Sequence, residues 1–401
     1  MELAARRGDF PALHQEVRGR PLVYLDNAST TFKPQTVIDA VVDAMARTPA
    51  NVHRGVHALS EAATEAFDAA RRDVAAFVGA AADEIVFTRG TTESINLVAQ
   101  AWGRIGLRPG DAVVATALEH HSNLVPWQLA CAERGATLRI APVDDDGRID
   151  VDRLAALLDE RVRLVAVSHL SNVLGTVAPI AAIARLAHAV GAHVLVDGAQ
   201  AITHLPVDVG ALDCDFYAFS GHKLYGPTGI GVLWGRSRLL ASMPPWQGGG
   251  EMVASVDLAG ARFREPPQRF EAGTPDIAGA IGLGAAVRYL RGLDRAAVDA
   301  HERALHARLV AGLRGIDGVR ILGRPEVAVV AFDLAGVHPH DLATIVDRDG
   351  IAIRSGHHCA EPLHRRLGLA GSARASLALY NRADEIDALV ASVAAAREVL
   401  R

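Results

Sequence analysis

Short apolar runs alternate with helical patterns over the first two thirds of the chain. Each run has the length of one strand, and we expect strands at residues 84–88, 112–116, 137–141, 164–168, 193–197, 216–220 and 230–234. The stretches between them predict helices at residues 92–102, 123–134, 151–158 and 180–190. Strands that alternate with helices are typical of parallel β-α units, so we expect an α/β fold with a mostly parallel central sheet flanked by helices.

The pattern changes near residue 275. An alanine- and glycine-rich helix over 275–290 and a charged stretch over 294–314 carry the chain away from the first sheet. Further strands are expected at residues 327–334, 351–354 and 375–379, followed by a closing helix over 384–400. This organisation predicts an N-terminal arm over residues 1–20, a large domain over 21–290, and a smaller C-terminal α/β domain over 291–401 on which the arm packs.

Composition narrows the class of protein. Half of the 401 residues are hydrophobic, but many are alanine, and no stretch approaches the roughly 18 uninterrupted apolar residues of a membrane span. Residues 1–20 contain no hydrophobic signal core, so we expect a cytoplasmic protein. The net charge of -5 without a basic block argues against a nucleic-acid-binding surface. Three scattered cysteines are too few for a disulfide framework or a tetrahedral zinc site.

Lysine is rare in this chain. Of the 41 basic residues only Lys33 and Lys223 are lysine, as if arginine had replaced lysine wherever positive charge alone was needed. Arginine cannot replace a lysine whose amine must lose its proton and form a Schiff base. Lys223 ends Ser220-Gly221-His222-Lys223, just after an apolar run, and is the candidate, although it could also be a surface lysine. Lys33 is interpreted as an ordinary surface-loop residue.

Polar residues follow the expected strands at their carboxyl ends, where open α/β sheets bind ligands. Asp197 ends a hydrophobic strand and could keep the ring nitrogen of a pyridine cofactor protonated, or it could simply cap a turn. Arg89 to Glu93 follows a strand and opens a helix, so the amides and hydroxyls of Thr91 and Thr92 could cradle a phosphate; an ordinary capping box is the alternative. Ser220 and His222 could add phosphate hydrogen bonds.

Two further motifs lie at this edge. Glu119-His120-His121-Ser122-Asn123 supplies an imidazole, His120, that can stack on a cofactor ring. Two adjacent histidines also suggest a metal, but no acidic residue or cysteine lies nearby at ligand spacing, so we expect none. Asn172, in Ser171-Asn172-Val173-Leu174-Gly175, suits a phenolic oxygen or a carboxylate, although alone it would be only a loop residue.

These motifs together resemble the class V aminotransferase-like pyridoxal phosphate enzymes, and most closely the Suf-type, or group II, cysteine desulfurases. The resemblance extends from Asp9 to the C-terminal helix, and its most specific stretch is Arg354-Ser355-Gly356-His357-His358-Cys359-Ala360. It implies the type I fold of pyridoxal-phosphate-dependent transferases. It also implies conversion of L-cysteine to L-alanine, with the sulfur held as a persulfide on Cys359 for iron-sulfur cluster assembly.

The resemblance implies a role for each candidate residue. Lys223 holds pyridoxal 5'-phosphate and moves the substrate proton, His120 stacks on the ring, and Arg374 binds the substrate carboxylate. Asp197 faces the ring nitrogen, and Gln200 and Asn172 bond the polar edge of the ring. The phosphate is bound by the polar residues around it, which are Thr91, Thr92, Ser220, His222 and, from the partner of an obligate homodimer, Thr274.

Cys359 follows a glycine and two histidines, whose partial positive charge could favour the reactive thiolate. Cys131 and Cys214 are interpreted as buried apolar residues. A sulfur-acceptor protein of the Suf type is the expected partner, and the short loop before Cys359 predicts slow basal turnover. Selenocysteine lyase or another class V reaction is the alternative activity, and a catalytically silent scaffold for sulfur transfer is the alternative of a different class.

Overall fold

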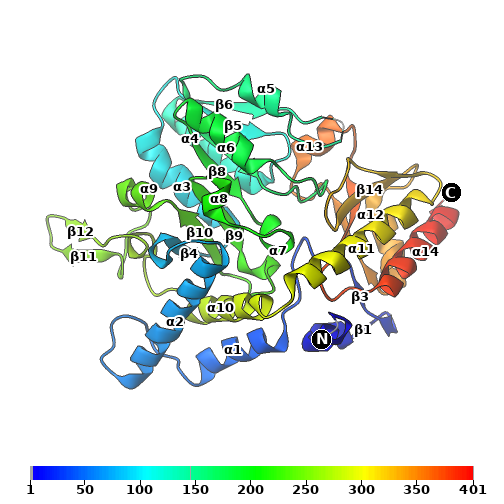
Figure 1. Ribbon diagram of the computed structural model, residues 1–401, viewed down its shortest axis with the longest axis horizontal. Coiled ribbons are helices and arrows are strands. Elements are labelled where there is room, and N and C mark those ends of the chain that lie inside the picture. Colours follow the sequence, from blue (N-terminus) through cyan, green and yellow to red (C-terminus); the bar gives the residue numbers. More distant parts are fainter. Residues whose placement is uncertain (1–2, 145, 401) are drawn as a thin grey trace.

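The computed structural model describes residues 3–144 and 146–400, and its centre is a seven-stranded sheet (Figure 1). The strand order is β4-β10-β9-β8-β7-β5-β6, and β10 alone runs antiparallel to its neighbours. The strands are β4 (Ile85–Thr88), β5 (Ala112–Thr116), β6 (Thr137–Ala141), β7 (Val162–Ser168), β8 (His193–Asp197), β9 (Phe216–Ser220) and β10 (Gly231–Gly235). This confirms the expected α/β fold with a mostly parallel sheet.

Helices cover both faces of this sheet. The helices of the first two thirds of the chain are α1 (Gln35–Ala46), α2 (Ala58–Phe77), α3 (Thr91–Gly106), α4 (Val125–Arg134), α5 (Val151–Ala155), α6 (Ile180–Ala189), α7 (Ala201–His204), α8 (Val209–Leu212), α9 (Ser237–Ser242) and α10 (Ile277–Arg291). One core lies between the sheet and α2, α6 and α10, and a second lies between the sheet and α3 and α4. Because both faces are covered, the central strands are continuously apolar, which is why they could be recognised in the sequence.

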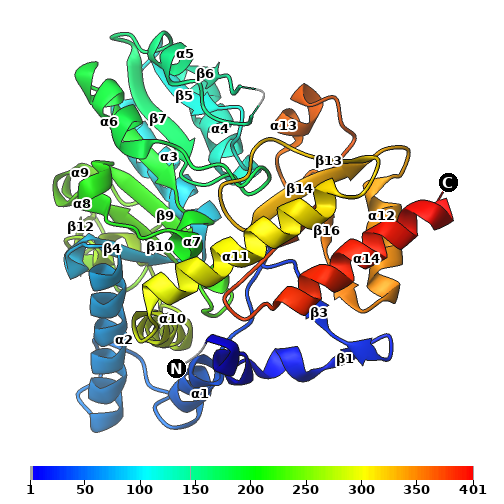
Figure 2. The same cartoon turned by 45° about the vertical axis from the view of Figure 1, so that its right-hand side comes forward.

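A second, antiparallel sheet follows, in the order β13-β14-β17-β16 (Figure 2). Its strands are β13 (Val319–Ile321), β14 (Val329–Leu334), β16 (Arg354–Gly356) and β17 (Ser372–Ser376), and the short β15 (Ile351–Ala352) pairs with β3 (Val23–Tyr24). The helices packed with them are α11 (Arg295–Arg314), α12 (Pro339–Arg348), α13 (Glu361–Arg366) and α14 (Ala383–Leu400). Near the N-terminus, Phe10 packs on the rings of Tyr225, Tyr289 and Tyr380.

Some elements differ from expectation. The strand expected at 375–379 is β17, at Ser372–Ser376, because its sequence Ser-Ala-Arg-Ala-Ser is not apolar enough to be seen. The helix expected to reach residue 158 ends at Ala155. Helices α1 and α2 and the hairpin of β11 (Val253–Val256) and β12 (Ala261–Phe263), which projects from the molecule in Figure 1, were not predicted. No helix within the described residues has the length and apolar character needed to span a membrane.

Candidate active site

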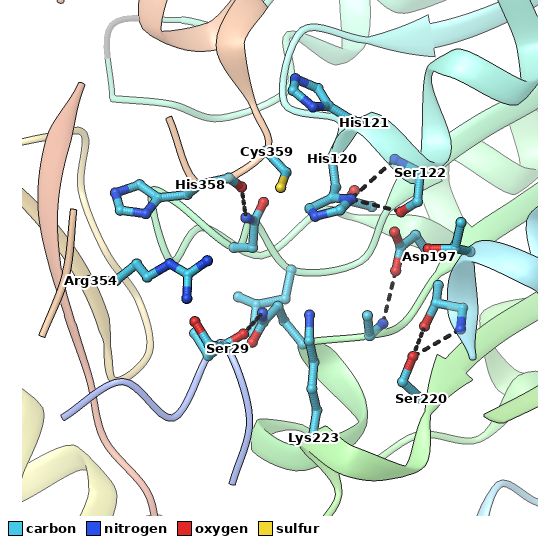
Figure 3. Close-up of a pocket in the computed structure, with 18 of the residues that line it drawn as sticks. Ser29, His120, His121, Ser122, Asp197, Ser220, Lys223, Arg354, His358 and Cys359 are labelled. Atoms are coloured by element: carbon cyan, nitrogen blue, oxygen red, sulfur yellow. Dashed lines mark hydrogen bonds between the residues drawn. The ribbon is translucent and has the colours of Figure 1, made fainter. Parts of the chain in front are cut away.

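A cavity of about 620 Å³ lies where the carboxyl ends of the central strands face the antiparallel sheet (Figure 3). The parallel sheet brings the ends of β5, β7, β8 and β9 to one edge, and β16 and β17 face that edge from the other side. Eleven residues predicted from the sequence line this cavity, namely Thr91, Thr92, His120, Asn172, Asp197, Gln200, Ser220, His222, Lys223, Cys359 and Arg374.

Thr274 lies elsewhere. It is an exposed residue just before α10 and lines a separate hollow, together with Met45 of α1 and Ile277. The structure therefore does not bring Thr274 to the cavity of its own chain.

Lys223 points into the cavity from the short helix after β9 (Figure 3). Burial lowers the pKa of its amine to about 8, against the opposing charge of Asp197. Asp197 is itself 5% exposed, and its carboxylate accepts a hydrogen bond from the Ala199 amide at 2.9 Å, the turn-capping contact that the sequence also allowed. Burial raises the pKa of this carboxyl group. The site thus holds an amine that can lose its proton near neutral pH and a buried carboxylate that favours a cationic neighbour.

The amino end of α3 forms one wall of the cavity. The Thr91 amide donates to Ser220 Oγ at 2.9 Å, and the hydroxyls of Thr91 and Ser220 lie 2.7 Å apart. Burial, and to a smaller extent the charge of Lys223, lowers the pKa of His222 to about 4, so its ring is neutral at pH 7. Amides, hydroxyls and a helix amino end meet here, which is the chemistry that binds a phosphate. The Glu93 carboxylate also accepts a hydrogen bond from the backbone amide of Arg89, as in the capping interaction that was the alternative interpretation of this segment.

His120 follows β5, and a buried network fixes the residues around it. Its Nδ1 lies 2.7 Å from Ser122 Oγ and accepts the Ser122 amide at 3.1 Å. Burial, and to a smaller extent the charge of Lys223, lowers the pKa of His120 to about 3, so the ring is neutral at pH 7. The adjacent Glu119, 2% exposed, accepts hydrogen bonds from Ser168 and Asn123. This network ties the ends of β5 and β7 together beneath the cavity.

Arg374 is a buried cation on β17. Its Nη1 donates to the Asn172 carbonyl at 2.9 Å, and its Nη2 contacts Asp26 at 3.1 Å and Ser29 at 3.0 Å. The Asn172 side chain donates to the carbonyl of His358 at 2.7 Å. The guanidinium is thereby fixed at the cavity wall, although Asp26 already occupies part of its hydrogen-bonding capacity.

Cys359 enters the cavity from the side opposite Lys223 (Figure 3) and is the exposed thiol of the three, whereas Cys131 and Cys214 are buried as expected. The partial positive charge of the two preceding histidines was expected to favour the thiolate, but His358 does not supply it by protonation. Burial, and to a smaller extent the charge of Arg374, lowers the pKa of His358 to about 2, so its ring is neutral at pH 7. Lys223 and Arg374 line the same cavity as Cys359, so this thiol shares the cavity with these two basic side chains.

The interpretation of Lys33 as an ordinary surface residue is also wrong. Its side chain is partly buried, its amine contacts Thr30 Oγ1 at 3.1 Å, and it lies 3.4 Å from the carbonyl of His222. Burial lowers the pKa of Lys33 to about 8. Lys33 therefore supports the turn that carries Lys223.

Sequence reasoning missed the residues that the N-terminal loop supplies. Ser29 and Ala28 line the cavity, and Asp26 holds Arg374. Arg354, on β16, lines the cavity from the other side. The polar run from Asp26 to Thr30, directly after the apolar residues 22–25, was the available signal. Nothing in the sequence showed that this loop returns to an edge formed nearly 200 residues later.

Comparison with known proteins identifies the family. The family model described as aminotransferase class V matches residues 23–389, and the chain belongs to this family. It is 55% identical over 390 residues to a cysteine desulfurase of Dickeya dadantii, covering 96% of this chain and 95% of the relative. Among solved structures it is similar to the cysteine desulfurase CsdA of Escherichia coli, with a TM-score of 0.94, 43% identity and full coverage of both chains. A C-DES variant with glycine covalently linked to its PLP cofactor matches with a TM-score of 0.81 and 25% identity, covering 97% and 98% of the two chains.

Proposed function

We propose that this protein is a pyridoxal-phosphate-dependent cysteine desulfurase that converts L-cysteine to L-alanine and retains the sulfur as a persulfide on Cys359. One observation carries the proposal: the exposed Cys359 thiol and the partly buried Lys223 amine enter the same cavity from opposite sides, with Arg374 in its wall. The desulfurases among its relatives support the same reaction.

The donor set of the cavity fits pyridoxal 5'-phosphate. Asp197 is a buried carboxylate that a cationic ring nitrogen would compensate, and Lys223 has the lowered pKa that a covalent link to an aldehyde requires. Thr91, Thr92, Ser220 and His222 would hold the phosphate beside the amino end of α3, and His120 would lie on the ring. Gln200 and Asn172 would bond the polar edge of the ring. When bound, the cofactor withdraws electrons from the substrate and weakens its C-S bond.

The side chains of this protein perform the remaining steps. Arg374 would hold the substrate carboxylate through its guanidinium, and the Lys223 amine would remove the α-proton and return it. The Cys359 thiolate would attack the substrate sulfur, so that one S-S bond forms while the C-S bond breaks and carbon receives a proton. The reaction balances as L-cysteine plus enzyme thiol giving L-alanine plus enzyme persulfide.

A homodimer completes this proposal. Thr274 shares a hollow with Met45 of α1. Further exposed apolar side chains lie on α1, in the segment after it and at the start of α2, namely Ile38, Val42, Val56 and Leu59. Exposed apolar surface of this kind marks interaction sites. If a second copy covers it, Thr274 would be carried toward the partner's phosphate. A sulfur-acceptor protein of the Suf type, supplying iron-sulfur cluster assembly, would then remove the persulfide.

To test this function, the purified protein is incubated with L-cysteine, and the alanine and sulfide that form are measured. We expect both products from the parent, loss of desulfuration in Cys359→Ala, and loss of the bound chromophore's usual absorbance in Lys223→Ala. Cys131→Ala, which removes a buried thiol remote from the cavity, is the matched control and should retain activity. Equal activity of Cys359→Ala and the parent would disprove the persulfide step, and a protein that never binds the cofactor would favour the silent scaffold. A strong preference for selenocysteine would favour the lyase.

A further inference from the structure

The backbone at Cys359 has an unusual conformation. His358 has φ of 50° and Cys359 has φ of 56°, so two consecutive residues with side chains occupy the left-handed region. This region is unfavourable for residues other than glycine and persists only where surrounding contacts impose it. Two of those contacts are made to backbone carbonyls of the loop: the Asn172 side chain donates to the His358 carbonyl, and the backbone amide of His121 donates to the Cys359 carbonyl at 2.7 Å.

A buried chain of hydrogen bonds holds the same loop from the other side. His358 Nε2 and His364 Nε2 each lie 3.0 Å from the hydroxyl of Ser372, and His364 Nδ1 lies 3.1 Å from the Ala360 carbonyl. His364 and Ser372 are fully buried, and His358 is 8% exposed. The three side chains therefore have no water-facing alternative to these bonds.

The donor and the acceptor of each hydrogen bond among these three side chains can be derived. A carbonyl only accepts, so His364 Nδ1 carries the proton that faces Ala360. Burial lowers the pKa of His364 and so favours the neutral ring, in which Nε2 accepts the Ser372 hydroxyl proton. Serine has one proton to donate, so it must accept from His358 Nε2. His358 Nδ1 is then an unprotonated acceptor, and it is buried with no partner among residues 3–144 and 146–400.

The strand that supplies Ser372 also supplies Arg374. Alternate residues of β17 point to the same face, so Ser372 and Arg374 lie on one face of the strand, where Arg374 lines the cavity. Ala373 and Ala375 pack in the core of the antiparallel sheet. One rigid strand thus holds both the cation proposed for the substrate carboxylate and, through two histidines, the loop of the thiol.

We propose that His358, Ser372 and His364 are positioning residues that set the Cys359 thiol at a fixed place relative to Arg374. The inference rests on the proposed function, because it assigns to β17 the alignment of substrate and attacking sulfur. Small displacements of a reacting group can lower a rate by about a hundredfold. Breaking these hydrogen bonds should therefore slow sulfur transfer without preventing substrate binding.

The test compares Ser372→Ala with Ser392→Ala in the holoenzyme. Ser392 is also buried, and its hydroxyl donates one hydrogen bond, to Asp349 at 2.7 Å, on α14 away from the cavity. Three quantities are measured: single-turnover formation of the Cys359 persulfide, KM for cysteine, and hydrogen exchange of the amides in residues 356–361. We expect Ser372→Ala to form persulfide at least about tenfold more slowly, with KM within about twofold of the parent and faster exchange in this segment. Ser392→Ala should match the parent in all three.

Equal rates and exchange in Ser372→Ala and the parent would overturn the inference, as would an equal loss in both serine variants. A second pair keeps it testable if Ser372→Ala does not fold. His358→Gln retains an N-H donor for Ser372 and should be faster than His358→Leu; equal slowing of the two would also overturn it. Hydrogen exchange does not depend on turnover, so a parent protein that releases no alanine would refute the proposed function while the positioning of the loop was still measured.

Discussion

The substitution Glu119→Gln tests the buried network beneath His120. The carboxylate is 2% exposed and accepts four hydrogen bonds, from Thr116 Oγ1, Asn123 Nδ2, the Ser168 amide and Ser168 Oγ, at 2.5 to 3.1 Å. Desolvation outweighs these bonds and raises the pKa of Glu119 from an ordinary value of 4.5 to about 7. Glutamine preserves the shape of the side chain but cannot titrate.

The sign and size of the effect follow from this pKa. Because the folded protein holds the proton more tightly than the unfolded chain, the contribution of Glu119 is most favourable below pH 4.5 and is lost as the pH rises through 7. A pKa of about 7 against 4.5 corresponds to a loss of about 2.5 kcal/mol in the free energy of unfolding between pH 5 and pH 8. The variant has no such loss, although one of its amide hydrogens faces a donor, which costs about 1 to 3 kcal/mol at every pH.

Reversible urea unfolding of the parent and the variant at pH 5, 6.5 and 8 measures this difference. We expect Glu119→Gln to be the less stable protein at pH 5 and to gain about 2.5 kcal/mol relative to the parent by pH 8. Glu65→Gln, at an exposed carboxylate on α2, is the matched control and should show no comparable change. A difference between parent and Glu119→Gln that stays constant from pH 5 to pH 8 would show that the buried carboxyl group does not titrate in this range.

Two further substitutions test how the site is supported. Arg71 binds both carboxylate oxygens of Glu271 at 2.7 and 2.8 Å in a buried pair. Arg71→Met removes one partner, so it should lower the free energy of unfolding in urea by about 3 to 5 kcal/mol. The double variant Arg71→Met/Glu271→Gln should lose less stability than the sum of the two single variants. Gly198→Ala places a Cβ 2.1 Å from Cε1 of Tyr217, so it should displace the turn after Asp197 and reduce cofactor retention on gel filtration; unchanged retention and melting temperature would contradict this.

The sequence was most informative where chemistry depends on strand order. Asp197 and Lys223 could be placed together because parallel strands end at one edge of a sheet, and the cavity contains both. Cys359 and Arg374 could not be placed in this way, because β16 and β17 are short and weakly apolar. Their positions rested on a motif resemblance, and the structure brings them to the same cavity.

Properties that depend on burial could not be predicted. His358 does not supply the expected partial positive charge by protonation, because its ring is enclosed by residues that include Ser372 and His364. Asp26 was missed because its contact with Arg374 joins positions 348 residues apart. Local patterns report the period and polarity of a segment, but they contain no information about which distant segment removes it from water.

The placement of the lysines has a practical consequence for chemical labelling. Lys33 is partly buried against the turn of Lys223, and Lys223 faces the cavity, so the outer surface presents its side-chain cations as arginine. Lysine-directed crosslinkers and acylating reagents would therefore have few surface targets. A modification of Lys223 would report on the cavity, and one of Lys33 on the turn that carries Lys223. In a mixture with lysine-rich partners, such reagents would label the partners and leave the surface of this protein largely unmodified.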